Sequence, residues 1–314
     1  MAVSQKQIAE RVGVSIALVS RVLSGKAREV GIAETTIKKV IRAAEEMGYV
    51  PSAAALTLKG KASRTIGVVV YDFRDPFFGP MIEKLQDCAH EQDYSLVIAG
   101  FKGRHPAASD LAPLHKHAID GLIVLGSSDE SEWLNGFSEM SVVRIGHRSA
   151  DDPGTCISVD EEDAAKQLMG HLISRGWKRG IFIGANLYGH SLRYQALEKT
   201  AQELGFELGR HIWAVDGFEA GEQSVKSLGD EMTALICAND PVAMGALRAL
   251  HDSGRKMPVT GFDDIPAAAQ YIPPITTYHQ PINEMVRQAF DAVVQKSEPV
   301  RKFIKGQLVI RSSS

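Results

Sequence analysis

The sequence predicts a small all-α head, a short linker and a larger α/β body made of two doubly wound lobes. In the first 50 residues, apolar side chains recur only at helical spacing. From Thr65 onward, short continuous apolar runs alternate with amphipathic segments, which is typical of parallel strands covered by helices. These alternations form two series, and the length of 314 residues is sufficient for two or three domains.

The head begins with two predicted helices, residues 5–12 and 16–24, joined by a tight turn. Gly13 stands where the turn needs a positive φ, and Ser15 is placed to cap the second helix. The outer face of that helix is small and polar with a single Arg, which suits the major groove of DNA. A helical hairpin with a solvated Arg is the alternative. The expected DNA contacts here are Ser4, Gln5, Ser15, Ile16, Ala17, Ser20, Arg21 and Ser24.

A third helix is predicted over residues 34–47, with Gly48 ending it. Pro51 then favours an extended backbone at Val50. A short Ala/Leu helix follows at residues 53–58, with Ser52 as its N-cap. So short a helix is unstable alone in water, so we expect it to fold against a partner such as DNA and the same helix of a second subunit.

The body contains nine predicted strands in two series. The first series is TIGVVVYD, SLVIAG, DGLIVLG and VVRIG, with helices near residues 79–92, 107–117 and 130–138. The second is CISVD, GIFIG, HIWAVD, ALICAND and PVTGFD, with helices near residues 161–175, 191–205, 219–229 and 241–253. Two doubly wound lobes with a cleft between them follow from this pattern.

Charge is distributed unevenly between head and body. Residues 1–64 contain 11 Lys and Arg against 5 Asp and Glu, whereas residues 65–314 contain 24 against 33. A basic head on an acidic body favours a polyanionic partner for the head.

Composition also points to a cytoplasmic protein. Cys88, Cys156 and Cys237 are odd in number and far apart, which suits a reducing compartment and gives no zinc-type spacing. No apolar run reaches the ~18 residues of a membrane helix, and no signal peptide is visible. We therefore expect buried free thiols, no metal or cofactor, and no membrane partner.

Three segments together resemble the LacI/GalR family of bacterial transcription regulators: IAERVGVSIALVSRVLSGK, GYVPSAAALTLKGK and TIGVVV. The resemblance implies a body like periplasmic sugar-binding proteins and a homodimer on a near-palindromic operator. It implies a hinge helix whose Leu58 enters the minor groove and kinks the DNA, although Leu58 could instead pack on its own domain. The expected hinge contacts are Ser52, Ala55, Leu58 and Lys59.

The resemblance also implies domain boundaries. Residues 1–50 would form the helix-turn-helix headpiece, residues 51–64 the hinge helix and linker, and residues 65–314 the effector-binding and dimerisation body. The chain would cross between lobes three times. The first lobe would comprise about 65–158 and 281–303, and the second about 159–280 and 304–314.

Side chains suited to a sugar follow several strands, at the carboxyl ends where doubly wound sheets bind ligands. Tyr71, Phe73 and Phe77 offer flat faces for a sugar ring or for packing at a lobe or dimer interface. Planar Arg, Asn and Asp groups can grip vicinal hydroxyls. Asp240 could instead cap the helix starting at Pro241. The resemblance implies effector contacts at Arg193, Phe218, Asn239, Asp240, Asp263 and Gln280, and at His147, where the family often has Arg.

The chain departs from the family pattern at three places. The link at residues 26–34 is longer, which leaves the end of the second helix open. The segment 254–261 is shorter, so we expect an abbreviated strand before Asp263. No heptad-bearing tail follows the final serines, so we expect a dimer and no tetramer.

The predicted function is a sequence-specific DNA-binding transcription regulator, expected to be a repressor that works on the nucleoid. Its effector in the cleft is expected to be a sugar, with a nucleobase-like ligand left open. The alternative is a cytoplasmic sugar-binding protein or a sugar-acting enzyme. The sequence contains no GxSxG, P-loop or clustered His/Glu metal set, and Asp72 and Asp75 suit turn formation, so we expect no enzyme activity.

Overall fold

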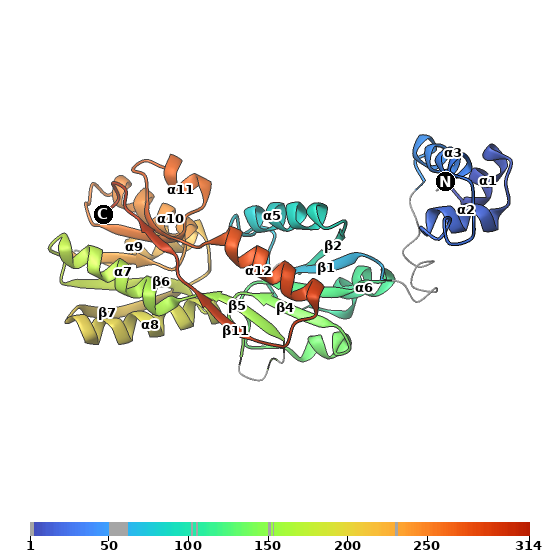
Figure 1. Cartoon of the computed structure of the whole chain (residues 1–314). Helices are drawn as coiled ribbons and strands as arrows, with labels where there is room; N and C mark the ends of the chain where they lie inside the picture. The colour runs from blue at the N-terminus through green and yellow to red at the C-terminus, as the bar shows by residue number, and fades with distance from the viewer. Residues whose placement is uncertain are drawn as a thin grey trace. The chain divides into compact units, whose positions relative to one another are not determined.

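The computed structural model describes residues 3–49, 62–101, 103–104, 106–149, 152, 154–229 and 232–314. The chain divides into two compact units, Met1–Ser63 and Arg64–Ser314 (Figure 1). The predicted hinge helix at 53–58 lies outside the described residues, and so do Ser52, Ala55, Leu58 and Lys59.

The head is a three-helix unit: α1 (Gln5–Val12), α2 (Ile16–Leu23) and α3 (Glu34–Glu46). Ile8, Val19 and Val40, one from each helix, are fully buried in its core. Gly13 has the expected positive φ of 74°, and the Ser15 side chain caps α2 by accepting a hydrogen bond from the Leu18 N–H. The helix α2 ends at Leu23, one residue earlier than predicted.

The first lobe has a six-stranded parallel sheet in the order β11-β5-β4-β3-β1-β2. Helices α5 and α12 cover one face, and α6 with the 3-10 helix η1 covers the other. The bounds are β1 (Thr65–Val70), α5 (Phe78–Glu91), β2 (Ser95–Gly100), α6 (Ala108–Lys116), β3 (Gly121–Leu125), η1 (Glu132–Phe137), β4 (Ser141–Ile145), β5 (Thr155–Val159), α12 (Ile282–Gln295) and β11 (Arg301–Ile304).

The second lobe repeats this three-layer plan in the order β12-β10-β9-β8-β6-β7, with only β12 antiparallel to its neighbour among the described strands. Helices α7 and α8 cover one face, and α9, α10 and the short α11 cover the other. The bounds are α7 (Glu161–Ser174), β6 (Arg179–Ala185), α8 (Tyr188–Leu204), β7 (Glu207–Ala214), α9 (Phe218–Lys226), β8 (Ala234–Cys237), α10 (Asp240–Asp252), β9 (Val259–Asp263), α11 (Pro266–Gln270), β10 (Thr276–His279) and β12 (Gln307–Val309).

Three expectations about elements are wrong. The run CISVD was grouped with the second series, although the expected lobe boundary near 158 assigns most of it to the first lobe; it belongs to the first sheet, because it forms β5 and pairs with β4 and β11. The helix expected near 130–138 is the short 3-10 helix η1. The strand before Asp263 is not abbreviated, since β9 is five residues long, as β3, β4 and β5 are, and all five of its residues are buried.

The chain crosses between the lobes three times: from β5 to α7, from β10 to α12 and from β11 to β12 (Figure 1). Tyr278, next to the second crossing, is fully buried. Its hydroxyl donates to Asp163 Oδ2 at 2.9 Å and accepts from the Gly306 N–H at 2.7 Å. The three crossings are therefore tied together by one side chain.

The three cysteines, Cys88, Cys156 and Cys237, are buried and free. Among the described residues, no helix combines the length and the hydropathy needed to cross a membrane.

One prediction concerns the contact between α9 and α10, where two glycines allow close packing. A Cβ on Gly245 would collide with the Phe218 carbonyl, and one on Gly221 with the Val242 carbonyl. Gly245→Ala should therefore lower the free energy of unfolding by about 1–3 kcal/mol, despite the better helix propensity of Ala. Urea unfolding followed by tryptophan fluorescence measures this, since Trp133, Trp177 and Trp213 all lie in the body.

Gly170→Ala is the matched control, because Gly170 lies inside α7 with open space around its Cβ position. This change should raise stability by about 0.4–1 kcal/mol. If Gly245→Ala were equally stabilising, the packing argument would be wrong.

Candidate functional site

A cavity of about 540 Å³ lies between the two lobes, at the carboxyl ends of several strands of both sheets. This volume is in the range of small-molecule sites. The predicted effector residues that line it are Tyr71, Phe77, His147, Arg193, Asn239, Asp263 and Gln280.

Three predicted effector residues do not line this cavity. Phe73 is 55% exposed, and its ring lies over Gly100 at the edge of the first sheet. Phe218 starts α9, with its carbonyl packed against α10. Asp240 is fully buried, and its Oδ2 accepts a hydrogen bond from the Ile265 N–H at 2.9 Å.

Asn239, and not Asp240, caps α10. Its Oδ1 accepts from the Val242 N–H at 3.0 Å, and its Nδ2 donates to Asp216 Oδ1 at 3.0 Å. The cap therefore fixes the amide and orients Asp216, a cavity residue that the sequence analysis missed.

A buried two-point contact in the cavity joins Arg193 on α8 to Glu161 at the start of α7. Arg193 Nε donates to Glu161 Oε2 at 2.9 Å, and Nη2 donates to Oε1 at 3.0 Å. His147 Nε2 lies 3.2 Å from the same Oε1. Burial acts to raise the pKa of Glu161, but Arg193 and His147 outweigh it and lower the pKa to about 2.

Two further contacts hold the Arg193 guanidinium in place. Its Nη1 donates to the Ala238 carbonyl at the end of β8. Its Cζ lies 3.2 Å from the ring centroid of Phe262, a cation–π contact. The sequence analysis missed Glu161, although this residue follows the buried strand CISVD just as Asn239 follows ALIC.

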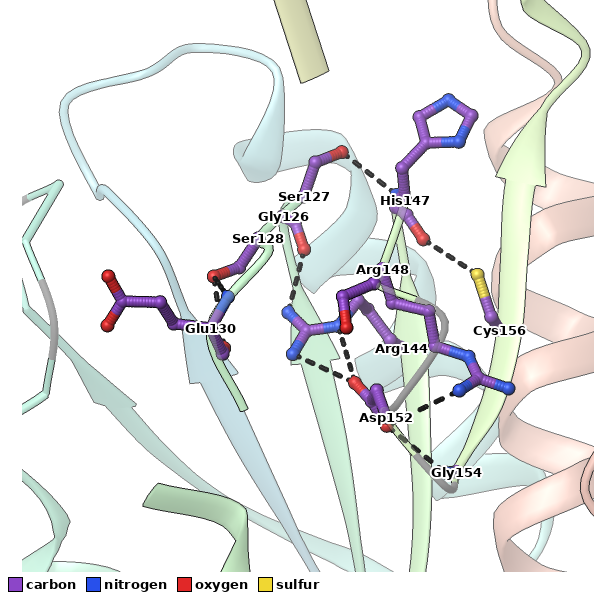
Figure 2. A network of polar contacts seen from close by, with 12 residues as sticks. Gly126, Ser127, Ser128, Glu130, Arg144, His147, Arg148, Asp152, Gly154 and Cys156 are labelled. Carbon is purple, nitrogen blue, oxygen red and sulfur yellow. Dashed lines mark hydrogen bonds and ion pairs between the residues drawn. The ribbon is translucent and has the colours of Figure 1, made fainter. Parts of the chain in front are cut away.

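A buried ion pair fastens the loop that carries His147 (Figure 2). Arg144 donates to Asp152 Oδ2 from Nε and Nη2, both at 3.3 Å, and from Nη1 to the Gly126 carbonyl at 3.1 Å. The His147 N–H donates to Ser127 Oγ at 2.9 Å. Because these contacts join the ends of β3 and β4, they set where the imidazole meets the cavity.

Two carboxyl groups from opposite lobes face this cavity with raised pKa values. Burial raises the pKa of Asp75 to about 6, and its Oδ1 accepts from the Phe77 N–H at 2.9 Å in the expected turn. Burial also raises the pKa of Asp263 well above its usual range, with Arg193 opposing. Gln280 Nε2 donates to Asp263 Oδ1 at 2.6 Å. These groups present oxygen atoms that can accept hydrogen bonds from a ligand.

His190 adds a neutral donor that the sequence analysis missed. Burial lowers its pKa to about 4, so the ring is uncharged at neutral pH. Its Nδ1 accepts from the Ala185 N–H at 3.1 Å, which leaves the ring proton on Nε2. Since His190 lines the cavity, Nε2–H is available as a donor with a fixed tautomer.

Apolar walls complete the cavity. Phe77 packs against the hydrophobic cores of both lobes, so its ring bridges them. The Tyr71 hydroxyl donates to the Gly103 carbonyl at 3.1 Å, which fixes the ring at the cavity wall.

In the head, the outer face of α2 is the candidate DNA-reading surface. Ile16 is 48% exposed, Ala17 and Arg21 are exposed, and Ser20 and Ser24 are half-buried. The Ser4 and Ser15 side chains cap α1 and α2. Gln5 Nε2 donates to the Tyr49 hydroxyl at 3.0 Å, so this amide already has an internal partner.

Comparison with known proteins gives the same division into head and body. A model of the lacI family of bacterial regulatory proteins matches residues 5–52. A model of the periplasmic binding protein-like domain matches residues 169–314.

Curated relatives match nearly the whole chain. The HTH-type transcriptional regulator RegA of Clostridium saccharobutylicum is 31% identical over 302 residues, covering 91% of this chain and 90% of RegA. The HTH-type transcriptional repressor PurR of Haemophilus influenzae is 31% identical over 333 residues, covering 98% of this chain and 97% of PurR.

Solved structures share the fold. The Lac repressor dimer bound to operator and the anti-inducer ONPF has a TM-score of 0.87 at 23% identity, covering 100% of this chain and 99% of that one. The complex of the transcriptional regulator CelR with cellobiose has a TM-score of 0.71 at 22% identity, covering 99% and 100%. The predicted fold of a helix-turn-helix headpiece and a two-lobed, periplasmic-binding-protein-like body is confirmed.

A pH prediction follows from the burial of Asp240. Burial raises its pKa to about 7, whereas the unfolded chain loses this proton near pH 4. Between these values the folded state binds the extra proton, so the free energy of unfolding falls as pH rises from about 4 to about 7. Asp240→Asn should remove this fall, and its stability relative to wild type should increase over that range.

Urea unfolding at several pH values tests this. Asp252→Asn serves as the control, because Asp252 is exposed at the other end of the same helix and bonds to Arg248. A stability difference between Asp240→Asn and wild type that does not change with pH would contradict the assignment.

Proposed function

The chain belongs to the LacI family of bacterial regulatory proteins, and from this we propose that it represses transcription under the control of a small molecule bound between its lobes. The observation that carries the proposal is the presence of two sites in one chain. One is the capped, two-faced helix α2 in the head, and the other is the polar cavity in the body.

For DNA binding, we propose that α2 enters the major groove and reads bases with its exposed outer face. Arg21 has the geometry to donate two hydrogen bonds to a guanine edge, and Ile16 can cover a thymine methyl group. Few other groups on this face can read bases. Specificity therefore requires two heads on a near-palindromic operator, which implies a homodimer. It also requires that the hinge residues 51–64 bend the DNA between the two heads.

For the effector, we propose a sugar. The cavity combines Arg, Asn and Asp side chains with an aromatic wall, which is the combination that recognises vicinal hydroxyls. Solved structures of the same fold contain cellobiose in one case and ONPG in another, and the cellobiose complex supports this class.

The effector would act by favouring one arrangement of the lobes. It can shift the equilibrium only by the difference in its affinity for the two states. Phe77 packs against the cores of both lobes, and His147 of the first lobe contacts Glu161 of the second. Closure around a ligand would therefore change contacts in both lobes.

We also propose that the body binds its ligand without chemical turnover. The whole protein would act on nucleoid DNA in the cytoplasm. The curated relatives are named as transcription regulators. The two neighbouring loop acids have structural partners, since Asp72 pairs with Arg74 and Asp75 accepts a hydrogen bond from the Phe77 N–H.

The DNA half of the proposal predicts that Arg21→Ala weakens binding to a selected operator by about 1–3 kcal/mol and relaxes the preference at one base pair. The operator is first selected from a random duplex library with the wild-type protein, and affinities are then measured by fluorescence anisotropy. Arg42→Ala is the control, because Arg42 lies on α3 and pairs with Glu46. Equal weakening on all sequences would make Arg21 a phosphate contact.

The effector half predicts that Arg193→Lys reduces the effect of the sugar on operator binding at least tenfold, because a lysine cannot keep the two-point contact with Glu161 and also offer further N–H groups to the ligand. Operator binding without sugar should stay within about twofold of wild type, which the same anisotropy assay measures. Arg179→Lys, at the other end of β6 from the cavity, is the control. Loss of operator binding without sugar would indicate a structural role for Arg193.

A further inference from the structure

The described residues that line the cavity carry an excess of acidic groups. Six carboxyl groups face two guanidinium groups. The acids are Asp72, Asp75, Asp129, Glu161, Asp216 and Asp263, and the guanidinium groups belong to Arg74 and Arg193.

Both guanidinium groups already have carboxylate partners. Arg74 Nη2 lies 2.6 Å from Asp72 Oδ2, with Nε contacting both oxygens. Arg193 gives Nε and one Nη2 proton to the two oxygens of Glu161, which is the bidentate geometry that a phosphate or carboxylate ligand would need. Because Glu161 has a pKa of about 2, this pair is neutral overall at physiological pH.

Three other acids of the cavity accept hydrogen bonds from neutral donors. Asp75 bonds to the Phe77 N–H, Asp216 to Asn239 Nδ2, and Asp263 to Gln280 Nε2. Their remaining oxygen atoms can accept hydrogen bonds from hydroxyl groups, and whichever of these carboxyl groups are ionised also repel an anion. The neutral Nε2–H of His190 supplies a donor without adding positive charge.

We propose that Glu161 makes this cavity select against anions, so that the effector is an uncharged polyhydroxylated molecule and not a sugar phosphate or sugar acid. The Glu161 carboxylate occupies the fork of Arg193 and cancels its charge. This inference rests on the proposed function of the cavity as the effector site. It makes Glu161 the residue that determines specificity with respect to charge.

Removing the Glu161 charge should convert the cavity into an anion site. In Glu161→Gln, Arg193 keeps a neighbouring amide oxygen but loses its counter-charge, and a buried guanidinium without one attracts an oxyanion. Glu162→Gln is the matched control. Glu162 lies in the same turn of α7 but is exposed, and it bonds to Lys199 at 2.6 Å outside the cavity.

The experiment titrates sulfate against full-length wild type, E161Q and E162Q at constant ionic strength, with chloride as the balancing anion, and follows Tm. All three proteins have the same basic head, so sulfate binding there cancels. We expect a saturable increase in E161Q only. At tenfold excess over the dissociation constant, the increase should be about 3–6 °C.

Two results would overturn the inference: an equal response of E161Q and E162Q, or a saturable sulfate response of wild type as large as that of E161Q. If E161Q does not fold, the Tm of the wild type still tests the inference. It is measured with glucose, glucose 6-phosphate and glucuronic acid, and then with the neutral, phosphorylated and acid forms of galactose and of ribose. Stronger stabilisation by any charged member than by its neutral parent contradicts the inference, and the reverse order supports it.

The two proposals fail separately. If E161Q gains a sulfate site while no sugar stabilises the wild type, anion exclusion stands and the sugar proposal is wrong. If a neutral sugar binds wild type and E161Q shows no sulfate response, the effector proposal stands and the role of Glu161 is wrong.

Discussion

The ion pair between Arg193 and Glu161 is the interaction on which the arrangement of the cavity depends. Glu161 stands at the first crossing between the lobes, and Arg193 also contacts the end of β8 and the ring of Phe262 on β9. Both side chains are buried, so each charge is tolerable only because the other is present. Removing one partner of such a pair typically costs about 3–5 kcal/mol. The pair therefore fixes the relative positions of α7, α8 and the ends of two strands before any ligand arrives.

The fold was largely predictable because the inner parallel strands, such as β1, β3, β8 and β9, are buried on both faces, which leaves continuous apolar runs in the sequence. The exceptions lie at sheet edges and at the lobe boundary. The strands β11 and β12 are too short to give a clear run, and CISVD was grouped with the wrong series because the crossing follows it immediately. Periodicity records which residues are buried, but not which of two sheets a strand joins.

Part of the cavity lining was predictable from one structural rule: polar residues at the carboxyl ends of parallel strands lie close together. Asn239 and Asp263, at the carboxyl ends of β8 and β9, line it for this reason, whereas Arg193 and Gln280 were indicated by the family resemblance. The same rule identifies Glu161, whose acidic side chain in the first turn of α7 reads in sequence as an ordinary helix start. Phe73, Phe218 and Asp240 do not line the cavity, because the direction in which a side chain points matters as well as its position in the sequence. Adjacent residues in a loop point to different sides, and only the fold decides which side is the cavity.

The sheet order has a consequence for how the chain is made. Each lobe receives its last strand from the final 14 residues of the sequence, β11 in the first sheet and β12 in the second. During synthesis, neither sheet is complete until its last strand, β11 or β12, has left the ribosome. Until then β5 and β10 are exposed sheet edges, which are templates for unwanted pairing. The body thus matures as one unit only after residues 301–309 have emerged, while the head, whose three helices lie between Gln5 and Glu46, can fold long before it.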